Sequence, residues 1–234
     1  MFEAEINNDK EVVILGAHIT LGTYHASPYW NPDDNSHDRA HAAGWLMTIR
    51  DTEAINEMLI WDCAFGKLIL RSLYVKRSWE EMIKSGLIPG LEITIDGMNF
   101  TCRVPHRDLD SDICKSLPWD SPYWIYDPKS ENISFELNEW DHEVVPILGP
   151  DKSYARLVLQ PHCPDLSQLV GQKIRLLSHS GTFTAHLLDV TEYDLICSDI
   201  KWLSGDVSKD WMLTKENQTY IVRNAILNAA VYEK

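Results

Sequence analysis

The sequence has little of the apolar character that directs proteins into or across membranes. Its 234 residues contain no unbroken apolar stretch near the roughly 18 that a transmembrane helix needs. The first residues, MFEAEINNDKEVV, are acidic, whereas a signal peptide is basic and then apolar. We therefore expect a cytoplasmic protein that does not enter a membrane.

Paired cysteines are also missing. The five cysteines are scattered, and none belongs to a Cys-x-x-Cys pair: Cys63, Cys102, Cys114, Cys163 and Cys197. An odd number without paired spacing favours reduced, buried thiols over a disulfide framework or a zinc ribbon. A chain of this length buries a sizeable core without such staples.

The motifs of the common enzymes do not occur. No GxGxxG, P-loop or GxSxG is found, so nucleotide cofactors and the familiar hydrolase mechanisms have no motif here. The adjacent His162 and Cys163 carry no family signature, and neighbouring side chains usually point apart. We expect no cofactor and lean towards a protein without catalytic activity. The enzymatic alternative is a hydrolase with two carboxylates that face each other across a cleft.

One loop contains part of a metal-binding pattern. His37 and His41 are four residues apart and would share one face of a helix, with several aspartates nearby. A third ligand at a known spacing is missing, and Asp38 follows His37 where a metalloprotease helix has Glu. We predict that no metal is bound. A metal-dependent hydrolase that uses His37 and His41 is the alternative.

The net charge of −14 is unevenly distributed along the chain. Residues 1–164 carry 14 basic and 26 acidic side chains, whereas residues 165–234 carry 7 and 9. A negative field opposes binding to a phosphate backbone. We therefore expect no broad nucleic-acid binding, and the charge keeps the protein in solution.

Tryptophan is unusually frequent: the chain has nine, which is about three times ordinary usage. Two proline-containing loops, residues 25–44 and 105–130, carry neighbouring rings: Tyr29, Trp30, Trp119, Tyr123 and Trp124. Rigid aromatic side chains lose little conformational entropy on contact. We predict that these rings form a binding face for a partner protein or a small molecule. The alternative is that they pack inward as core.

Local signals in the first part predict helices and a hairpin. Ser78 to Glu81 form a capping box before a helix that ends near Gly86. Residues 91–95 and 98–104 alternate in polarity around Asp96-Gly97, which is typical of a type I′ hairpin. We also expect a short helix from Asp51 or Thr52 to Leu59, a helical turn over 138–145 and a strand over 154–160.

The last seventy residues contain short strands joined by turns. Residues 173–177 lead through Gly181 into a strand over 182–190, followed by 193–197 and by a final segment from Tyr220 to Val231. This spacing predicts a small antiparallel barrel. Residues 200–216 form an insertion that would lengthen the last hairpin.

This order of strand, glycine turn, bent strand, strand after a polar-aromatic turn and final strand resembles the Sm/Hfq-like fold. Members of that family form rings of five to seven subunits that bind RNA at the pore, so the resemblance implies a homo-oligomer. Tyr193 falls where the family stacks a base, and Arg223 with Asn224 falls on its Lys-His pair. Asn224 replaces the His, and Glu192 replaces the usual Gln. RNA binding is therefore an alternative function, and Tyr193 and Arg223 can also be read as half-buried barrel residues.

Taken together, the patterns predict a β-rich α+β protein in two domains. Residues 1–164 form a mixed, acidic domain, and residues 165–234 form the barrel, with a linker over 161–168. The segments GLEITIDGMNFTCRVP, NEWD and YARLVL resemble stretches of bacterial and phage proteins that carry no assigned activity. We expect a non-enzymatic binding or oligomerisation protein.

Overall fold

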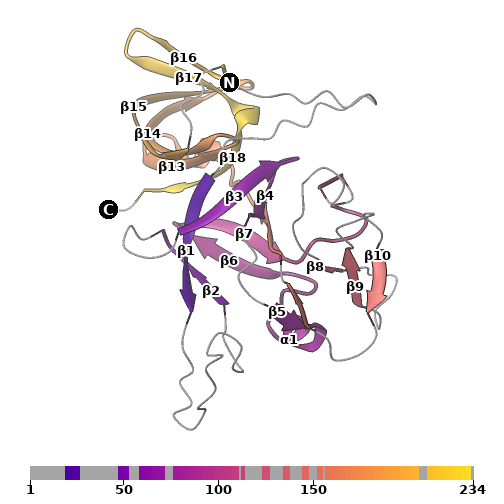
Figure 1. Ribbon diagram of the computed structural model, residues 1–234. Coiled ribbons are helices and arrows are strands. Elements are labelled where there is room, and N and C mark those ends of the chain that lie inside the picture. The colour runs from indigo at the N-terminus through magenta and orange to yellow at the C-terminus, as the bar shows by residue number, and fades with distance from the viewer. Residues whose placement is uncertain are drawn as a thin grey trace.

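The computed structural model describes residues 19–26, 47–52, 58–71, 76–110, 112–113, 123–126, 134–137, 144–147, 152–154, 156–205 and 210–232. Three sheets make up most of this part of the chain, and its one α-helix is short (Figure 1). The predicted predominance of strands is confirmed. None of the described helices is long and apolar enough to cross a membrane.

The first sheet has seven strands and the order β2-β1-β3-β4-β12-β7-β6. Its strands are β1 (Ile19–Ala26), β2 (Met47–Arg50), β3 (Met58–Ala64), β4 (Lys67–Leu70), β6 (Leu91–Ile95), β7 (Met98–Arg103) and β12 (Val158–Pro161). All neighbouring strands are antiparallel. Trp61 and Phe100 are fully buried in its core, and the Trp61 indole N–H donates to the Leu21 carbonyl at 2.8 Å.

Two local predictions in this part are confirmed. Asp96 and Gly97 join β6 to β7 with φ of 54° and 80°, the positive values that a type I′ turn requires. Helix α1 (Trp79–Lys84) follows Ser78, and Gly86 beyond its end has a φ of 77°.

The helix expected from Asp51 or Thr52 to Leu59 is wrong at its end, because β3 begins at Met58. Both polar residues bind the β6–β7 turn. Asp51 Oδ1 accepts from the Asp96 N–H at 2.6 Å, and the Thr52 N–H and hydroxyl donate to the Asp96 carboxylate at 2.9 and 2.7 Å. Asp and Thr are frequent helix caps because their side chains bond to backbone N–H groups. Here Asp51 uses the same acceptor for a backbone N–H that is distant in sequence.

The second sheet has five strands and the order β10-β9-β8-β11-β5. They are β5 (Lys76–Ser78), β8 (Tyr123–Ile125), β9 (Ser134–Leu137), β10 (Val144–Ile147) and β11 (Lys152–Tyr154). The expected helical turn over 138–145 is wrong at Val144, which begins β10, and the loop expected over 105–130 contains β8. Pro146 lies in β10 at the edge of the sheet, where a missing N–H is tolerated.

The third sheet has six strands and the order β16-β17-β15-β14-β13-β18. They are β13 (Lys173–Ser178), β14 (Gly181–Val190), β15 (Asp194–Gly205), β16 (Met212–Lys215), β17 (Gln218–Val222) and β18 (Ile226–Val231), with 3-10 helices η1 (Leu166–Leu169) and η2 (Arg223–Ala225). The sheet is strongly curled (Figure 1). Phe183 of β14 is fully buried, and the centre of its ring lies 4.9 Å from that of Trp202. Contrary to expectation, the insertion does not lengthen the pairing of β15 with β17: it supplies the end of β15, which pairs with β14, and the strand β16, which forms its own hairpin with β17.

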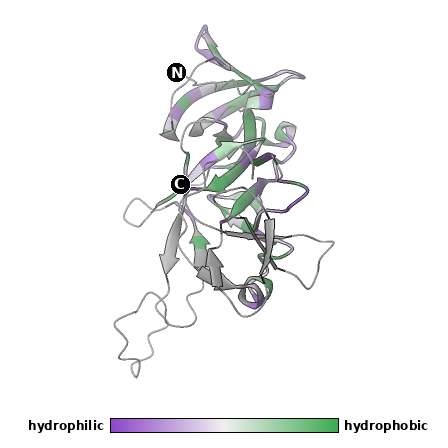
Figure 2. Cartoon of the chain, turned by 45° about the vertical axis from the view of Figure 1, so that its right-hand side comes forward, coloured by the Kyte–Doolittle hydropathy of each residue, from purple (hydrophilic) through white to green (hydrophobic). Residues whose placement is uncertain are grey.

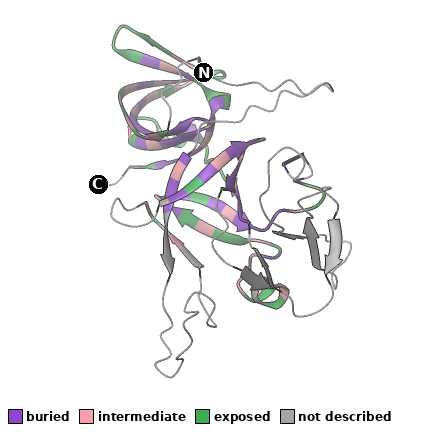
Figure 3. Cartoon of the chain, viewed as in Figure 1, coloured by how far each residue is buried: buried purple, intermediate pink, exposed green. Residues whose placement is uncertain are grey.

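The first and third sheets pack directly against each other. Leu177 and Ala230 of the third sheet belong to the same buried cluster as Trp61 and Phe100. Figure 2 shows apolar segments in the strands of both sheets, and Figure 3 shows buried positions where they meet. The chain passes from β12, which ends at Pro161, to η1, so the passage coincides with the predicted linker. The division into two domains stays a prediction.

Candidate functional site

A cleft of about 610 Å³ opens where the first and third sheets meet. A volume of this size is in the range of about 300–1,000 Å³ that ligand sites occupy. Its walls come from five separate regions of the chain, which the fold brings together: Asp51; the β6–β7 turn and the start of β7 with Asp96, Gly97 and Asn99; His162 and Pro164 after β12; Arg175 of β13; and Ala229, Ala230, Val231 and Tyr232 at the end of the third sheet.

Asp96 is the fixed anion of the cleft. Its carboxylate accepts the two Thr52 hydrogen bonds and forms an ion pair with Arg175. The side chain is 8% exposed, and charge-assisted bonds in such a place are stronger than neutral ones. The pair therefore joins the β6–β7 turn to β13 across the cleft.

Arg175 also contacts the aromatic wall. Its guanidinium carbon lies 5.4 Å from the centre of the Tyr232 ring, and the Lys173 ammonium lies 5.2 Å from the same ring. Cations at this distance are attracted by the ring face. Arg175 Nε is buried without a hydrogen-bond partner among the described residues.

His162 stands at the rim, with its side chain 47% exposed. The Thr101 hydroxyl donates to Glu92 Oε1 at 2.5 Å and lies 2.6 Å from His162 Nε2. Because a hydroxyl has one hydrogen, Nε2 must carry the proton and donate to Thr101. Thr101 therefore holds His162 in place at the rim of the cleft.

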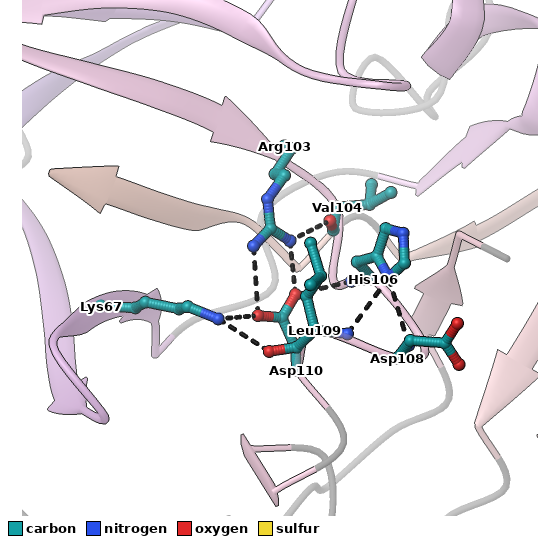
Figure 4. Close-up of polar contacts among 7 residues, drawn as sticks. All are labelled: Lys67, Arg103, Val104, His106, Asp108, Leu109 and Asp110. Atoms are coloured by element: carbon teal, nitrogen blue, oxygen red, sulfur yellow. Dashed lines mark hydrogen bonds and ion pairs between the residues drawn. The ribbon is translucent and has the colours of Figure 1, made fainter. Parts of the chain in front are cut away.

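A second polar cluster, centred on Asp110, lies beyond β7 (Figure 4). The buried Asp110 carboxylate accepts from two Arg103 nitrogens, from Lys67 Nζ at 2.6 Å and from the His106 backbone N–H at 2.6 Å. Burial disfavours its charge, but the hydrogen bonds outweigh burial and hold the Asp110 pKa below its usual value. The carboxylate has no spare acceptor site for a substrate, so the cluster anchors the turn after β7.

A cysteine and a histidine meet between the sheets although 116 residues separate them. Cys63 Sγ lies 3.5 Å from His179 Nδ1, and His179 Nε2 lies 3.2 Å from the Asn224 carbonyl. Burial, with the nearby Asp62 carboxylate, raises the Cys63 pKa to about 12. The thiol is therefore protonated and donates to Nδ1, so this pair joins two sheets and lacks the thiolate of a nucleophile.

Several predicted site residues lie outside the described residues: Tyr29, Trp30, His37, His41 and Trp119. Tyr123 and Trp124 lie on β8, where the structure describes the backbone alone. The prediction of an aromatic binding face therefore stays a prediction. Among the described residues, no group of three or more His, Cys, Asp or Glu is arranged to hold a metal ion.

The residues named through the Sm/Hfq resemblance do meet. The Arg223 N–H donates to the Tyr193 carbonyl at 2.8 Å, and Tyr193, Arg223 and Asn224 are all exposed. Tyr193 is 71% exposed, so reading it as a half-buried barrel residue is wrong.

Comparisons with known proteins give no match. No protein-family model, no curated protein and no solved structure is similar to this chain. Its function must therefore be argued from the cleft and the exposed residues themselves.

Proposed function

We propose that this is a non-enzymatic binding protein and that the cleft between the first and third sheets holds its ligand. The observation that carries the proposal is the convergence of residues from five chain regions, several with hydrogen-bonding groups, on one hollow of about 610 Å³. Concave sites with a few fixed polar groups at a junction are where ligands usually bind.

Fixed groups favour binding over proton transfer here. Both Asp96 oxygens already accept from Thr52 or Arg175, and the Thr101 hydroxyl links Glu92 to His162. Side chains tied in this way hold their orientation, which selects a complementary ligand. The hydrolase alternative needs a carboxylate that exchanges protons, and the Asp96 oxygens are engaged.

A fragment screen tests the proposal. We expect some small polar fragments to shift the ¹H–¹⁵N signals of Gly97, Asn99 and Tyr232. Asn99 is exposed at the cleft, so Asn99→Trp should fill the hollow, keep the fold and abolish those shifts. If fragments shift no cleft amide, or shift them equally in Asn99→Trp, the cleft is not the ligand site.

We further propose that residues 165–234 form an Sm-like barrel that self-associates. Support comes from the strand order, from the turn at Gly181 and from the three register shifts that bend β14 along β15. The free edge for a second copy is β16, next to the exposed Leu213, because the hairpin of β6 and β7 lies against β18. Light scattering that finds a monomer at tens of micromolar would remove this proposal.

RNA binding is the second candidate, and the exposed pair Tyr193 and Arg223 favours it. An exposed ring and an exposed guanidinium, carried by two residues that a backbone hydrogen bond joins, suit a stacked base and its phosphate. Glu192 and Asp194 flank Tyr193 and oppose the phosphate. Fluorescence anisotropy with labelled oligouridine and oligoadenosine at low salt tests it: binding should weaken in both Tyr193→Ala and Arg223→Ala. If both variants bind the oligonucleotides as tightly as the wild type, Tyr193 and Arg223 are not the RNA site.

A further inference from the structure

Strand β18 is an edge strand, and its free side faces the cleft. In an antiparallel strand, the N–H and C=O of one residue point to the same side, and successive residues alternate. The Tyr232 N–H donates to the Lys173 carbonyl at 2.9 Å, so Tyr232 and, two residues earlier, Ala230 face β13. Ala229 and Val231 therefore direct their backbone groups away from β13, and both line the cleft.

Most of this edge is closed by the protein itself. The Ala229 N–H donates to the Asn228 side-chain oxygen at 2.9 Å, and the Asn228 amide donates to the Asn99 carbonyl at 2.7 Å. Gly97 packs so close that a Cβ there would lie 3.2 Å from Ala230 Cβ. A long strand from another folded copy cannot pair along this whole edge.

One position stays open. Val231 is 41% exposed, and its N–H and C=O have no partner among the described residues. An exposed edge with unpaired backbone groups is the usual site where an extended peptide adds a strand. The cleft of about 610 Å³ lies beside Val231, and Gly97 borders it on the carbonyl side, because a Cβ at Gly97 would lie 3.9 Å from the Val231 oxygen.

The charge around the opening selects a cation. Asp51 is exposed and uses Oδ1 for the Asp96 N–H, and Glu92, with its side chain 71% exposed, stands beside His162. Of the cations near the opening, Arg175 is paired with Asp96, and the Lys173 ammonium lies over the Tyr232 ring, 5.2 Å from its centre. Two outward carboxylates favour a basic side chain and disfavour a phosphate chain.

We propose that the cleft binds a short extended peptide, which pairs its backbone with Val231 of β18 and places a basic side chain near Asp51. The proposal rests on the cleft being the ligand site and names the class of ligand. Backbone pairing would supply affinity, and the carboxylates would supply specificity.

The test uses the full chain and the peptide acetyl-Val-Lys-Val-Lys-Val-amide, followed by ¹H–¹⁵N spectra. We expect a saturable shift of the Val231 amide signal and slower hydrogen exchange at that amide. Replacing both lysines by glutamate should weaken binding about tenfold or more, because like charges would then face each other at Asp51. A factor of ten corresponds to about 1.4 kcal/mol of binding free energy. Of two peptides N-methylated at alternate amides, the one that blocks the paired face should lose binding.

Protein variants complete the test. Val231→Pro removes the N–H that faces the cleft while keeping the ladder to β13, and we expect about tenfold weaker binding. Val231→Ala keeps the N–H and is the matched control, with affinity near that of the wild type. Asp51→Asn keeps the oxygen that accepts from the Asp96 N–H but removes the charge. It should lower the affinity for the lysine peptide and leave the affinity for the glutamate peptide no lower.

The outcomes separate the peptide from the cleft. If fragments shift the cleft amides but neither the peptide nor its analogues shift Val231, the peptide inference is wrong and the ligand site stands. If both leave the cleft unchanged, both proposals are wrong. Equal binding of the two N-methylated peptides would exclude strand addition without relying on any protein variant, and a Val231 shift with oligouridine would assign the cleft to RNA instead.

Discussion

Replacing Asp110 by asparagine should destabilise the protein strongly. Lys67 donates to Oδ1, the His106 N–H donates to Oδ2, and Arg103 donates to both oxygens. Asparagine has one oxygen, so in either orientation its NH₂ group faces donors and the buried guanidinium loses its counter-ion. Removing one partner of a buried ion pair costs about 3–5 kcal/mol.

Urea unfolding at pH 7, followed by tryptophan fluorescence and circular dichroism, measures this loss. Asp210→Asn makes the same change of charge at an exposed residue and should stay within about 0.5 kcal/mol of the wild type. A loss below about 1 kcal/mol in Asp110→Asn would show that the carboxylate does not anchor the turn after β7.

The same pair of proteins has a predictable dependence on pH. The folded-state pKa of Asp110 lies below the unfolded value of about 3.9, so its ionisation stabilises the fold above that pH. This contribution is lost as the pH falls through the lower folded value. The difference in stability between wild type and Asp110→Asn should therefore shrink below about pH 4, and a difference that grows with acid would contradict the assignment.

Three further predictions concern packing and access. Phe183→Ala should cost about 3–5 kcal/mol of unfolding free energy in a denaturant titration, whereas Leu213→Ala, at a 65% exposed position, should cost under about 1 kcal/mol; similar losses would disprove the aromatic core. Gly97→Ala should lower the melting temperature more than Gly171→Ala. Both glycines have a positive φ, which costs an alanine about 1–2 kcal/mol, but only the methyl at Gly97 would be crowded, 3.2 Å from Ala230 Cβ. Among the four described cysteines, a thiol reagent at pH 8 should modify the exposed Cys163 first, because the other three are buried with pKa values raised to about 12; peptide mapping in which a buried thiol reacts first would contradict this.

Local chemistry made part of the fold predictable. Asp96-Gly97 predicts its hairpin because that dipeptide tolerates positive φ, and the capping-box pattern from Ser78 to Glu81 predicts α1 because such residues generally satisfy the backbone groups of a first helical turn. The strands β13 and β14 were predictable from turn glycine and alternation, which act over a few residues. The helix predicted from Asp51 or Thr52 is wrong at its end, and the signal at its start was ambiguous because Thr52 binds Asp96, which is 44 positions away.

The cleft was not predictable for the same reason. Arg175 meets Asp96 across two sheets, and Cys63 meets His179 over 116 residues, with no spacing that a motif search detects. The one partial signal was His162, which drew attention as a neighbour of Cys163, whereas its actual partner is Thr101. Pairings of this kind are fixed by the order of strands in a sheet, which hydrophobic alternation leaves open.

The position of β12 has a consequence for how the chain folds during synthesis. This strand lies inside the first sheet, between β4 and β7, although it follows them by more than fifty residues in sequence. Until the ribosome has released Pro161, β4 and β7 each present an unpaired edge, which invites aggregation. A nascent chain stalled before Val158 has been synthesised should therefore depend on chaperones. A chain stalled once β12 has left the ribosomal tunnel should resist proteolysis across the first sheet.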